Sequence, residues 1–176
     1  MKEWASITEA LAHGRQIAIL RKGGIVEADR SGFQLRHREF LLFPTHEHQH
    51  ARMLRPEAAG LVQPMEEGRI PIGTLARVTE VRRAPADAGL LLHDEFIWNQ
   101  EFLDQRYLYR PDLPLWLIVI RAYRLPEPVI IPDRASYAGC KSWVNLTEEI
   151  EIGGAQPALS DAEFARRCAA LGNRLG

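Results

Sequence analysis

Three histidines and a glutamate fall within five residues, directly after an apolar run that stops at a proline. Residues 40 to 50 are FLLFPTHEHQH, and His46, Glu47 and His50 match the pattern H-E-x-x-H. On a helix this spacing places two histidines one turn apart, where they can bind zinc, with the glutamate between them as a base. One hypothesis for this stretch is therefore a metal-dependent hydrolase.

The position of the motif favours a different chemistry. Thr45 can cap a helix that runs from His46 to about Arg55 and must end before Pro56. The motif would then occupy the first helical turn, where free backbone amides attract anions and the helix dipole opposes a dication. His48 and Gln49 are donors suited to a phosphate or the edge of a base, so anion recognition is the second hypothesis.

A second basic element occurs earlier in the chain. Arg21 and Lys22 precede Gly23 and Gly24, and two glycines allow a ligand to approach the backbone closely. A plain hairpin turn explains the same two glycines equally well. Trp98, Trp116 and Trp143 lie in apolar runs typical of a core, although a tryptophan beside a pocket can stack on a base.

Charge is distributed unevenly along a chain whose formal net charge is −1. Residues 1 to 55 contain nine Lys or Arg against six Asp or Glu, a local net charge of +3, and five of the six histidines. Phosphate affinity depends on the charges near the backbone of the nucleic acid, so this part can bind it on a neutral protein. Arg15, Arg36 and Arg38 are expected to add phosphate affinity.

Length and composition predict one soluble domain. The chain has 176 residues, of which 26% are charged and 46% hydrophobic. No signal peptide or membrane span is recognisable, so a cytoplasmic location is expected. Cys140 and Cys168 have no C-x-x-C spacing, and neither a disulfide framework nor a cysteine zinc site is predicted. We expect a single domain over residues 1 to 176, with residues 158 to 176 as a helical appendage at its C-terminus.

The hydrophobic pattern changes period repeatedly, which indicates mixed α and β structure. In the first half it predicts a helix over residues 2–13, a strand over 16–22, further strands in 24–29, 33–37 and 39–44, and a loop over 56–71. In the second half it predicts strands over 73–84, 114–125 and 142–146, with 128–132 as a continuation or partner of the second, and helical structure within 87–108. Ser160 and Glu163 form a capping box for a last helix that ends at Gly172.

Four blocks of the sequence together resemble an uncharacterised bacterial family, domain of unknown function 1802. They are EWASITEALAHGRQIAILRKGGI, FLLFPTHEHQ, LWLIVIRAYRLPEPV and YAGCKSWVNL, which extend to about residue 150. Some members of that family occur beside Mrr-like restriction nuclease domains, which implies a link to restriction or defence. Its pattern retains Pro44, Thr45, His48 and Gln49.

A second resemblance concerns architecture. The entry A-L-x-x-G-R-Q followed by a strand ending L-R-K is similar to that of PUA-like barrels, including ASCH and EVE domains, which are associated with RNA binding or with reading modified bases. Both resemblances imply nucleic acid, although a fold does not determine a function.

Together these observations predict a mixed α+β domain with a small, mainly antiparallel, curved or closed sheet surrounded by helices. The leading function is a nucleic-acid-binding accessory module that reads a modified base, without a cofactor or resident metal and without a catalytic role. An Mrr-like nuclease is its expected partner, and the hydrolase at His46, Glu47 and His50 is the alternative. The predicted contacts are Arg15, Arg21, Lys22, Gly23, Gly24, Arg36, Arg38, His48 and Gln49. Leu41 and Phe43 are expected on the core side of their strand, with His48 and Gln49 on the helical turn that follows, facing a pocket shared with Arg21 and Lys22.

Overall fold

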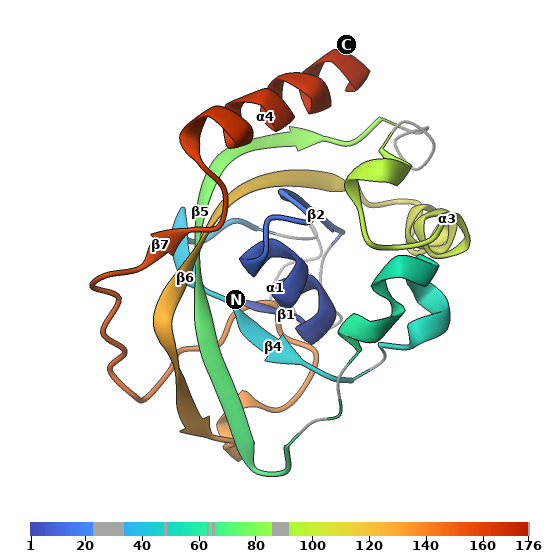
Figure 1. Ribbon diagram of the computed structural model, residues 1–176. Helices are drawn as coiled ribbons and strands as arrows, with labels where there is room; N and C mark the ends of the chain where they lie inside the picture. Colours follow the sequence, from blue (N-terminus) through green and yellow to red (C-terminus); the bar gives the residue numbers. More distant parts are fainter. Residues whose placement is uncertain (23–33, 48, 63, 65, 86–91, 176) are drawn as a thin grey trace.

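Two long antiparallel strands dominate the fold. The computed structural model describes residues 1–22, 34–47, 49–62, 64, 66–85 and 92–175. Strands β5 (Arg69–Arg83) and β6 (Trp116–Pro132) pair along most of their length, with β2 (Ala18–Arg21) beside β6 and β3 (Glu39–Leu41) beside β5. The short β7 (Gln156–Pro157) also pairs with β6. Figure 1 shows β5 and β6 curving around α1 (Ala5–Ala12). The predicted mixed α/β fold with a mainly antiparallel, curved sheet is confirmed; the sheet is open.

The curvature has a local cause. The pairing of β5 with β6 changes register between Ile72 and Thr74 and again between Val78 and Glu80. The first shift leaves residues 125–128 of β6 opposite Gly73, and the second leaves Thr79 of β5 as one extra residue. Such irregularities bend the strand and increase its twist. The bend lets one pair of strands line two cores. The larger lies between the sheet and α1, and the smaller contains Phe43, Ile70, Ile72, Ile131 and Tyr137.

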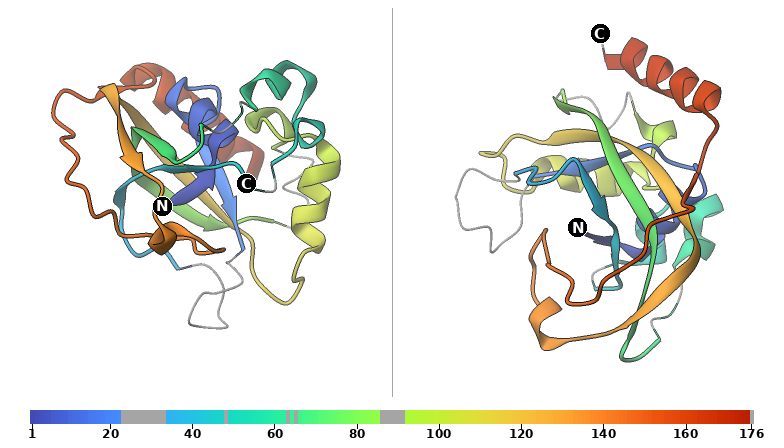
Figure 2. Two further views of the ribbon diagram at one scale, coloured as in Figure 1. Left: turned by 90° about the horizontal axis from the view of Figure 1, so that it is seen from below. Right: turned by 90° about the vertical axis from the view of Figure 1, so that its left-hand side faces the viewer.

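A small parallel sheet crosses one end of this arrangement. Strand β1 (Lys2–Trp4) pairs in parallel with β4 (Phe43–Thr45), with Lys2 opposite Phe43 and Trp4 opposite Thr45. Figure 2 shows the N-terminal strand entering the interior of the fold beside the remaining strands. This sheet therefore brings the first residues of the chain next to the predicted site stretch.

Short helical segments complete the structure. The 3-10 helices are η1 (Ala51–Met53), η2 (Pro56–Leu61), η3 (His93–Glu95) and η4 (Ala135–Tyr137), and the remaining α-helices are α3 (Gln100–Leu108) and α4 (Asp161–Leu175). Phe164 and Leu171 of α4 are buried against the main core. The Ser160 hydroxyl caps α4 by accepting a hydrogen bond from the Glu163 amide at 3.2 Å, as predicted.

Several predicted elements are wrong. The first helix begins at Ala5, because residues 2–4 pair with β4. The predicted helix from His46 to Arg55 does not form; only η1 is helical there. Residues 34–37 and 142–146 are not strands, and the loop expected over 56–71 contains η2 and the start of β5. The last helix continues through Gly172 to Leu175. The strand expected over 24–29 lies outside the described residues.

The long strands were predicted well. Residues 128–132 continue the strand that begins at Trp116, so β6 is one element. The strand expected over 16–22 is present as β2, and residues 73–84 lie almost entirely within β5.

Candidate functional site: a basic pocket with an aromatic wall

A pocket of about 190 Å³ lies between β1, the end of β2, α3 and residues 139–142. Its lining includes five cationic side chains and two carboxylates, together with an aromatic wall. We call it the basic pocket; the cations are Lys2, Arg21, Lys22, Arg106 and Lys141, the carboxylates Glu3 and Glu47, and the aromatic residues Trp4, Trp98 and Phe102. Thr45, Gly139, Cys140 and Ser142 complete the lining.

Most of these cations are held by backbone carbonyls. The Lys22 ammonium donates to the Tyr107 carbonyl, Arg106 Nη2 donates to the Leu20 carbonyl at 3.3 Å, and Lys2 Nζ donates to the Gly139 carbonyl at 2.9 Å. Carbonyl oxygens orient a cation without neutralising its charge. The pocket therefore carries an excess of positive charge.

Arg21 forms an ion pair with Glu3. Its Nη2 lies 2.9 Å from Glu3 Oε2 and also donates to the Lys2 carbonyl. Glu3 in turn accepts a hydrogen bond from the Trp4 amide at 2.8 Å. This ion pair ties β1 to the end of β2 and so fixes one side of the pocket.

Burial lowers the pKa of three further cations of the pocket. The pKa of Lys22 is lowered, first by burial and then by the neighbouring Arg106 guanidinium. The pKa of Arg106 is lowered by burial and by Arg21, and burial also lowers the pKa of Lys2. Burial disfavours the charged form of each side chain, and an anion in the pocket would oppose that effect. Such clusters of perturbed groups mark candidate functional sites.

The aromatic wall is a stack of three rings. Trp4 lies 4.9 Å from Phe102 and Trp98 lies 5.6 Å from Phe102, measured between ring centroids. Asn99 caps α3 by accepting a hydrogen bond from the Phe102 amide at 2.9 Å, which positions that ring. Phe102 and Trp98 are buried, whereas Trp4 is half-buried and presents its ring at the pocket.

A second pocket adjoins the basic pocket. It has a volume of about 360 Å³ and shares Lys2, Thr45 and Glu47 with the basic pocket. The rest of its lining is more apolar and comprises Phe43, Pro44, His46, Arg69, Ile70, Pro71, Asp133, Tyr137 and Ala138.

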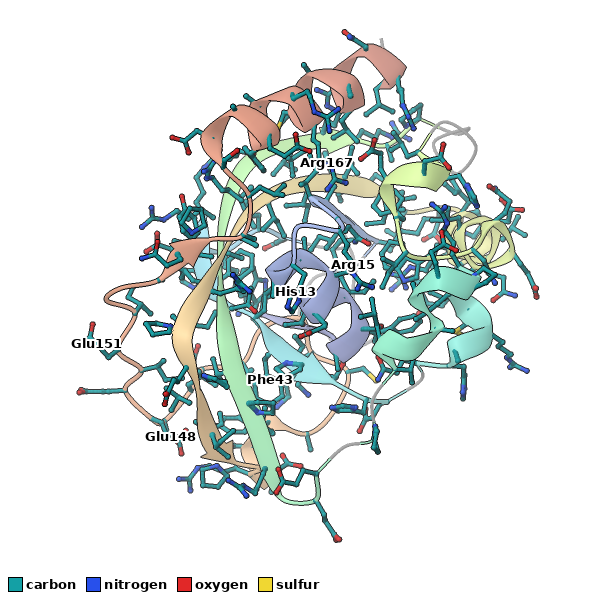
Figure 3. The ribbon with its side chains drawn as sticks, in the orientation of Figure 1. His13, Arg15, Phe43, Glu148, Glu151 and Arg167 are labelled. Carbon is teal, nitrogen blue, oxygen red and sulfur yellow. The ribbon has the colours of Figure 1, made fainter. Side chains whose placement is uncertain are left out.

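The structure brings two of the predicted contact residues together. Arg21 and Lys22 both line the basic pocket. Arg15 lies elsewhere, beside α4, where its carbonyl accepts a hydrogen bond from Arg167 Nη2 at 3.2 Å (Figure 3). Arg36 and Arg38 are exposed residues that precede β3. Gly23, Gly24 and His48 lie outside the described residues.

Gln49 has a structural role that the sequence does not reveal. Its side chain is only 8% exposed, and its Oε1 accepts hydrogen bonds from the Ser6 amide at 3.3 Å and the Ser6 hydroxyl at 3.1 Å. Ser6 lies in the first turn of α1, where a free amide needs an acceptor. The prediction that Gln49 lies on a helical turn and faces the pocket of Arg21 and Lys22 is therefore wrong.

The hydrolase motif lacks its expected geometry. His46 and Glu47 follow β4 without helical structure, with Glu47 in a turn, and His50 precedes η1, so the three side chains are not on one helix. Within the described residues no group of three or more His, Cys, Asp or Glu side chains is placed to hold a metal ion.

Sequence reasoning missed most of the pocket. Arg106, Lys2 and Lys141 are isolated cations far apart in the chain, and no spacing relates them to Lys22. The available signal was the aromatic content of residues 96–107, because a tryptophan beside a pocket can stack on a base. Trp98 fits that description, whereas Trp143 packs edge-on against Phe40 with their ring centroids 5.0 Å apart.

Comparison with known proteins identifies the family. The family described as "Domain of unknown function (DUF1802)" matches residues 1–170. No curated protein and no solved structure matches the chain. In the described part of the chain, no helix combines the length and the apolar character that a membrane span requires. Since the match covers nearly the whole sequence, the chain belongs to the DUF1802 family.

Proposed function

We propose that this protein is a nucleic-acid-binding module that holds a phosphate of its ligand in the basic pocket. The observation that supports the proposal most directly is the composition of that pocket, in which five cationic side chains face two carboxylates beside an aromatic wall. Nucleic acid supplies the two complementary chemistries, a phosphate for the cations and a flat base for the rings.

The donors of the pocket are suited to a phosphate. Lys22 is only 4% exposed, and within the described structure its ammonium makes one hydrogen bond, to the Tyr107 carbonyl. An ammonium has three hydrogens, so two remain for a ligand. Arg106 adds a forked guanidinium, whose geometry matches phosphate oxygens. A phosphate between these side chains would neutralise charge that the protein leaves uncompensated.

The aromatic wall supports base stacking. Trp4 is half-buried and backed by Phe102 and Trp98, so its orientation is set before a ligand arrives. A ring held in this way loses little conformational entropy on binding. Recognition of a modified base is part of the proposal; it draws support from the resemblance to PUA-like barrels and from the second pocket next to the phosphate site.

Salt dependence tests the central claim. If the five cations of the basic pocket contact phosphates, the slope of log K against log salt concentration should be about −3 to −5. Fluorescence anisotropy with labelled single-stranded RNA and DNA measures this slope and compares the two backbones. An affinity that is absent at low salt, or that does not change with salt, would contradict the proposal.

The proposed link to restriction concerns a partner protein. It is supported by the occurrence of related sequences beside Mrr-like nuclease domains. Gel filtration of this protein mixed with a purified Mrr-like nuclease, with and without DNA, tests it. Elution of the two proteins as separate peaks under both conditions would rule out a stable complex.

A further inference from the structure

We propose that the second pocket binds a nucleobase adjacent to the phosphate in the basic pocket, and that Glu47 selects bases that carry an exocyclic amino group. This inference rests on the proposed function and adds to it a base site and a specificity-determining residue.

The two pockets are adjacent and share part of their lining, which we call the shared wall. Lys2, Thr45 and Glu47 line both of them. The second pocket, at about 360 Å³, is within the usual range of about 300–1,000 Å³ for small-molecule sites, and the basic pocket is smaller at about 190 Å³. A ligand whose phosphate occupies the smaller pocket can therefore place its larger group in the second one.

The lining of the second pocket suits a flat heterocycle. Phe43 and Tyr137 form a buried floor with their ring centroids 5.4 Å apart, and Ile70 and Pro71 contribute further apolar surface. The Tyr137 hydroxyl is held by Glu148 Oε2 at 2.8 Å and by the Thr147 hydroxyl at 3.0 Å. The floor is thus fixed without a ligand, as expected for a preformed binding pocket.

Glu47 is the carboxylate of the shared wall, and it distinguishes between bases. Its side chain is exposed and its charge raises the pKa of Lys2 against the lowering by burial, whereas within the described structure its carboxylate makes no hydrogen bond or ion pair. A negative charge beside a phosphate site weakens phosphate binding, so phosphate recognition does not explain its presence. An ionised carboxylate only accepts hydrogen bonds, and in nucleic acids it accepts them from amino groups such as N4 of cytosine. Thymine and uracil lack such a group.

A pair of homopolymers tests the role of Glu47. Wild-type protein is titrated with fluorescein-labelled oligodeoxycytidylate and oligothymidylate of equal length, about 12 nucleotides, at one salt concentration. We expect oligodeoxycytidylate to bind about tenfold more tightly, the difference that one base-specific hydrogen-bonding contact supplies. Glu47→Gln should abolish this preference while oligothymidylate binds as tightly as before or more tightly, because a repulsive charge is removed.

A matched variant controls for the change in net charge. Glu127 is an exposed carboxylate on β6 that lines neither pocket. Glu127→Gln removes the same charge and should keep the wild-type preference. Equal preferences in Glu47→Gln and in wild type would overturn the assignment of Glu47.

Blocking the second pocket tests the base site independently of Glu47. Ala138 is exposed and lines that pocket, whereas Ala135 is exposed and lines neither pocket. Ala138→Trp should remove the preference for oligodeoxycytidylate but leave the salt slope of binding, and Ala135→Trp should change neither. Thermal melting of each variant establishes that it is folded.

The outcomes separate this inference from the proposed function. Salt-dependent binding of both oligonucleotides with equal affinity by wild-type protein would overturn the base site and leave the phosphate site standing. Failure of every oligonucleotide to bind would overturn both. Loss of the preference in Glu47→Gln and in Ala138→Trp, with retention in both controls, would support the inference.

Discussion

The basic pocket and the cluster around Glu148 differ in the partners of their charged side chains. In the cluster, which we call the Glu148 network, one carboxylate accepts hydrogen bonds from Arg134 at 2.6 and 2.9 Å, from Tyr137 at 2.8 Å and from Thr147 at 3.0 Å. In the basic pocket, Lys2, Lys22 and Arg106 donate to backbone carbonyls. The Glu148 network pairs its carboxylate with Arg134, whereas the basic pocket keeps an excess of positive charge.

The protonation equilibria reflect this difference. Hydrogen bonds from Arg134 and then Tyr137 lower the pKa of Glu148 to about 2, and the same pairing raises the pKa of Arg134. In the basic pocket, burial lowers the pKa of Lys2, Lys22 and Arg106. The comparison teaches that the carboxylate of the Glu148 network is paired within the protein, whereas the basic pocket has more cationic side chains than carboxylates.

Phe43→Ala should have the largest effect, because Phe43 lies between the two regions. Its ring is in edge contact with Tyr137 of the Glu148 network, and Lys2 Nζ of the basic pocket lies 5.7 Å from its centroid. Removing a buried phenylalanine ring leaves a cavity and should lower the free energy of unfolding by about 3 kcal/mol or more. Denaturant titration measures the change.

Ile130 supplies the control for this substitution. It is 42% exposed on β6, so Ile130→Ala should cost no more than about 0.5 kcal/mol. Similar costs for the two substitutions would show that Phe43 is not an integral part of the smaller core.

Lys22→Met should weaken oligonucleotide binding without lowering stability, and Arg134→Met should lower stability without weakening binding. Lys22→Met removes a charge-assisted contact to phosphate and should weaken oligonucleotide binding by about 2 kcal/mol, or roughly 30-fold. Its stability should be unchanged or higher, because an apolar side chain of similar length replaces a buried charge. Anisotropy titration and thermal melting give the two quantities.

Arg134→Met should behave in the opposite way. Arg134 is exposed and lines neither pocket, so binding should remain within about twofold of wild type, while the loss of a surface ion pair lowers stability slightly. Equal losses of oligonucleotide affinity in Lys22→Met and Arg134→Met would contradict the prediction that the ligand binds at the basic pocket and not at the Glu148 network.

The smallest expected effect is the pH dependence of stability due to Glu148. Its pKa in the folded protein, about 2, is below the ordinary value of 4.5, so its stabilising contribution is complete above pH 4.5 and is lost as pH falls toward about 2. Glu148→Gln should therefore be less stable than wild type at neutral pH, and the difference should shrink across this window. Denaturant titrations along a pH series measure it, and a difference that stays constant down to about pH 2 would contradict the assignment.

The sequence alone predicted the elements that depend on local patterns. Alternating residues in 73–84 and 114–125 predicted the long strands, and Ser160 predicted the start of α4, because strand periodicity and helix capping act over a few residues. The predicted end at Gly172 failed because the cost of a helical glycine, about 1 kcal/mol, is small beside the packing of Leu175, which lies beyond it and contacts the main core.

Residues 142–146 show how a pattern can mislead. Their alternation predicted a strand, but Trp143 packs on the main core while Val144 and Leu146 pack on the smaller one. The Trp143 indole donates to the Gln34 carbonyl at 3.0 Å, and the Lys2 amide donates to the Ser142 carbonyl at 2.9 Å. Contacts with separate parts of the chain thus satisfy the apolar side chains without a strand ladder.

Only the tertiary structure shows which residues line the candidate site. The sequence alone determined the family, the mixed α/β class and Arg21 and Lys22 as candidate contacts. It could not show that Arg106 lies beside Lys22, that Trp4 faces the same pocket, or that Gln49 is an acceptor for Ser6 and not an exposed donor. These relations join residues from about 40 to 85 positions apart. Local propensity extends over only a few residues, so charges and acceptors at such separations are brought together by packing of the whole chain.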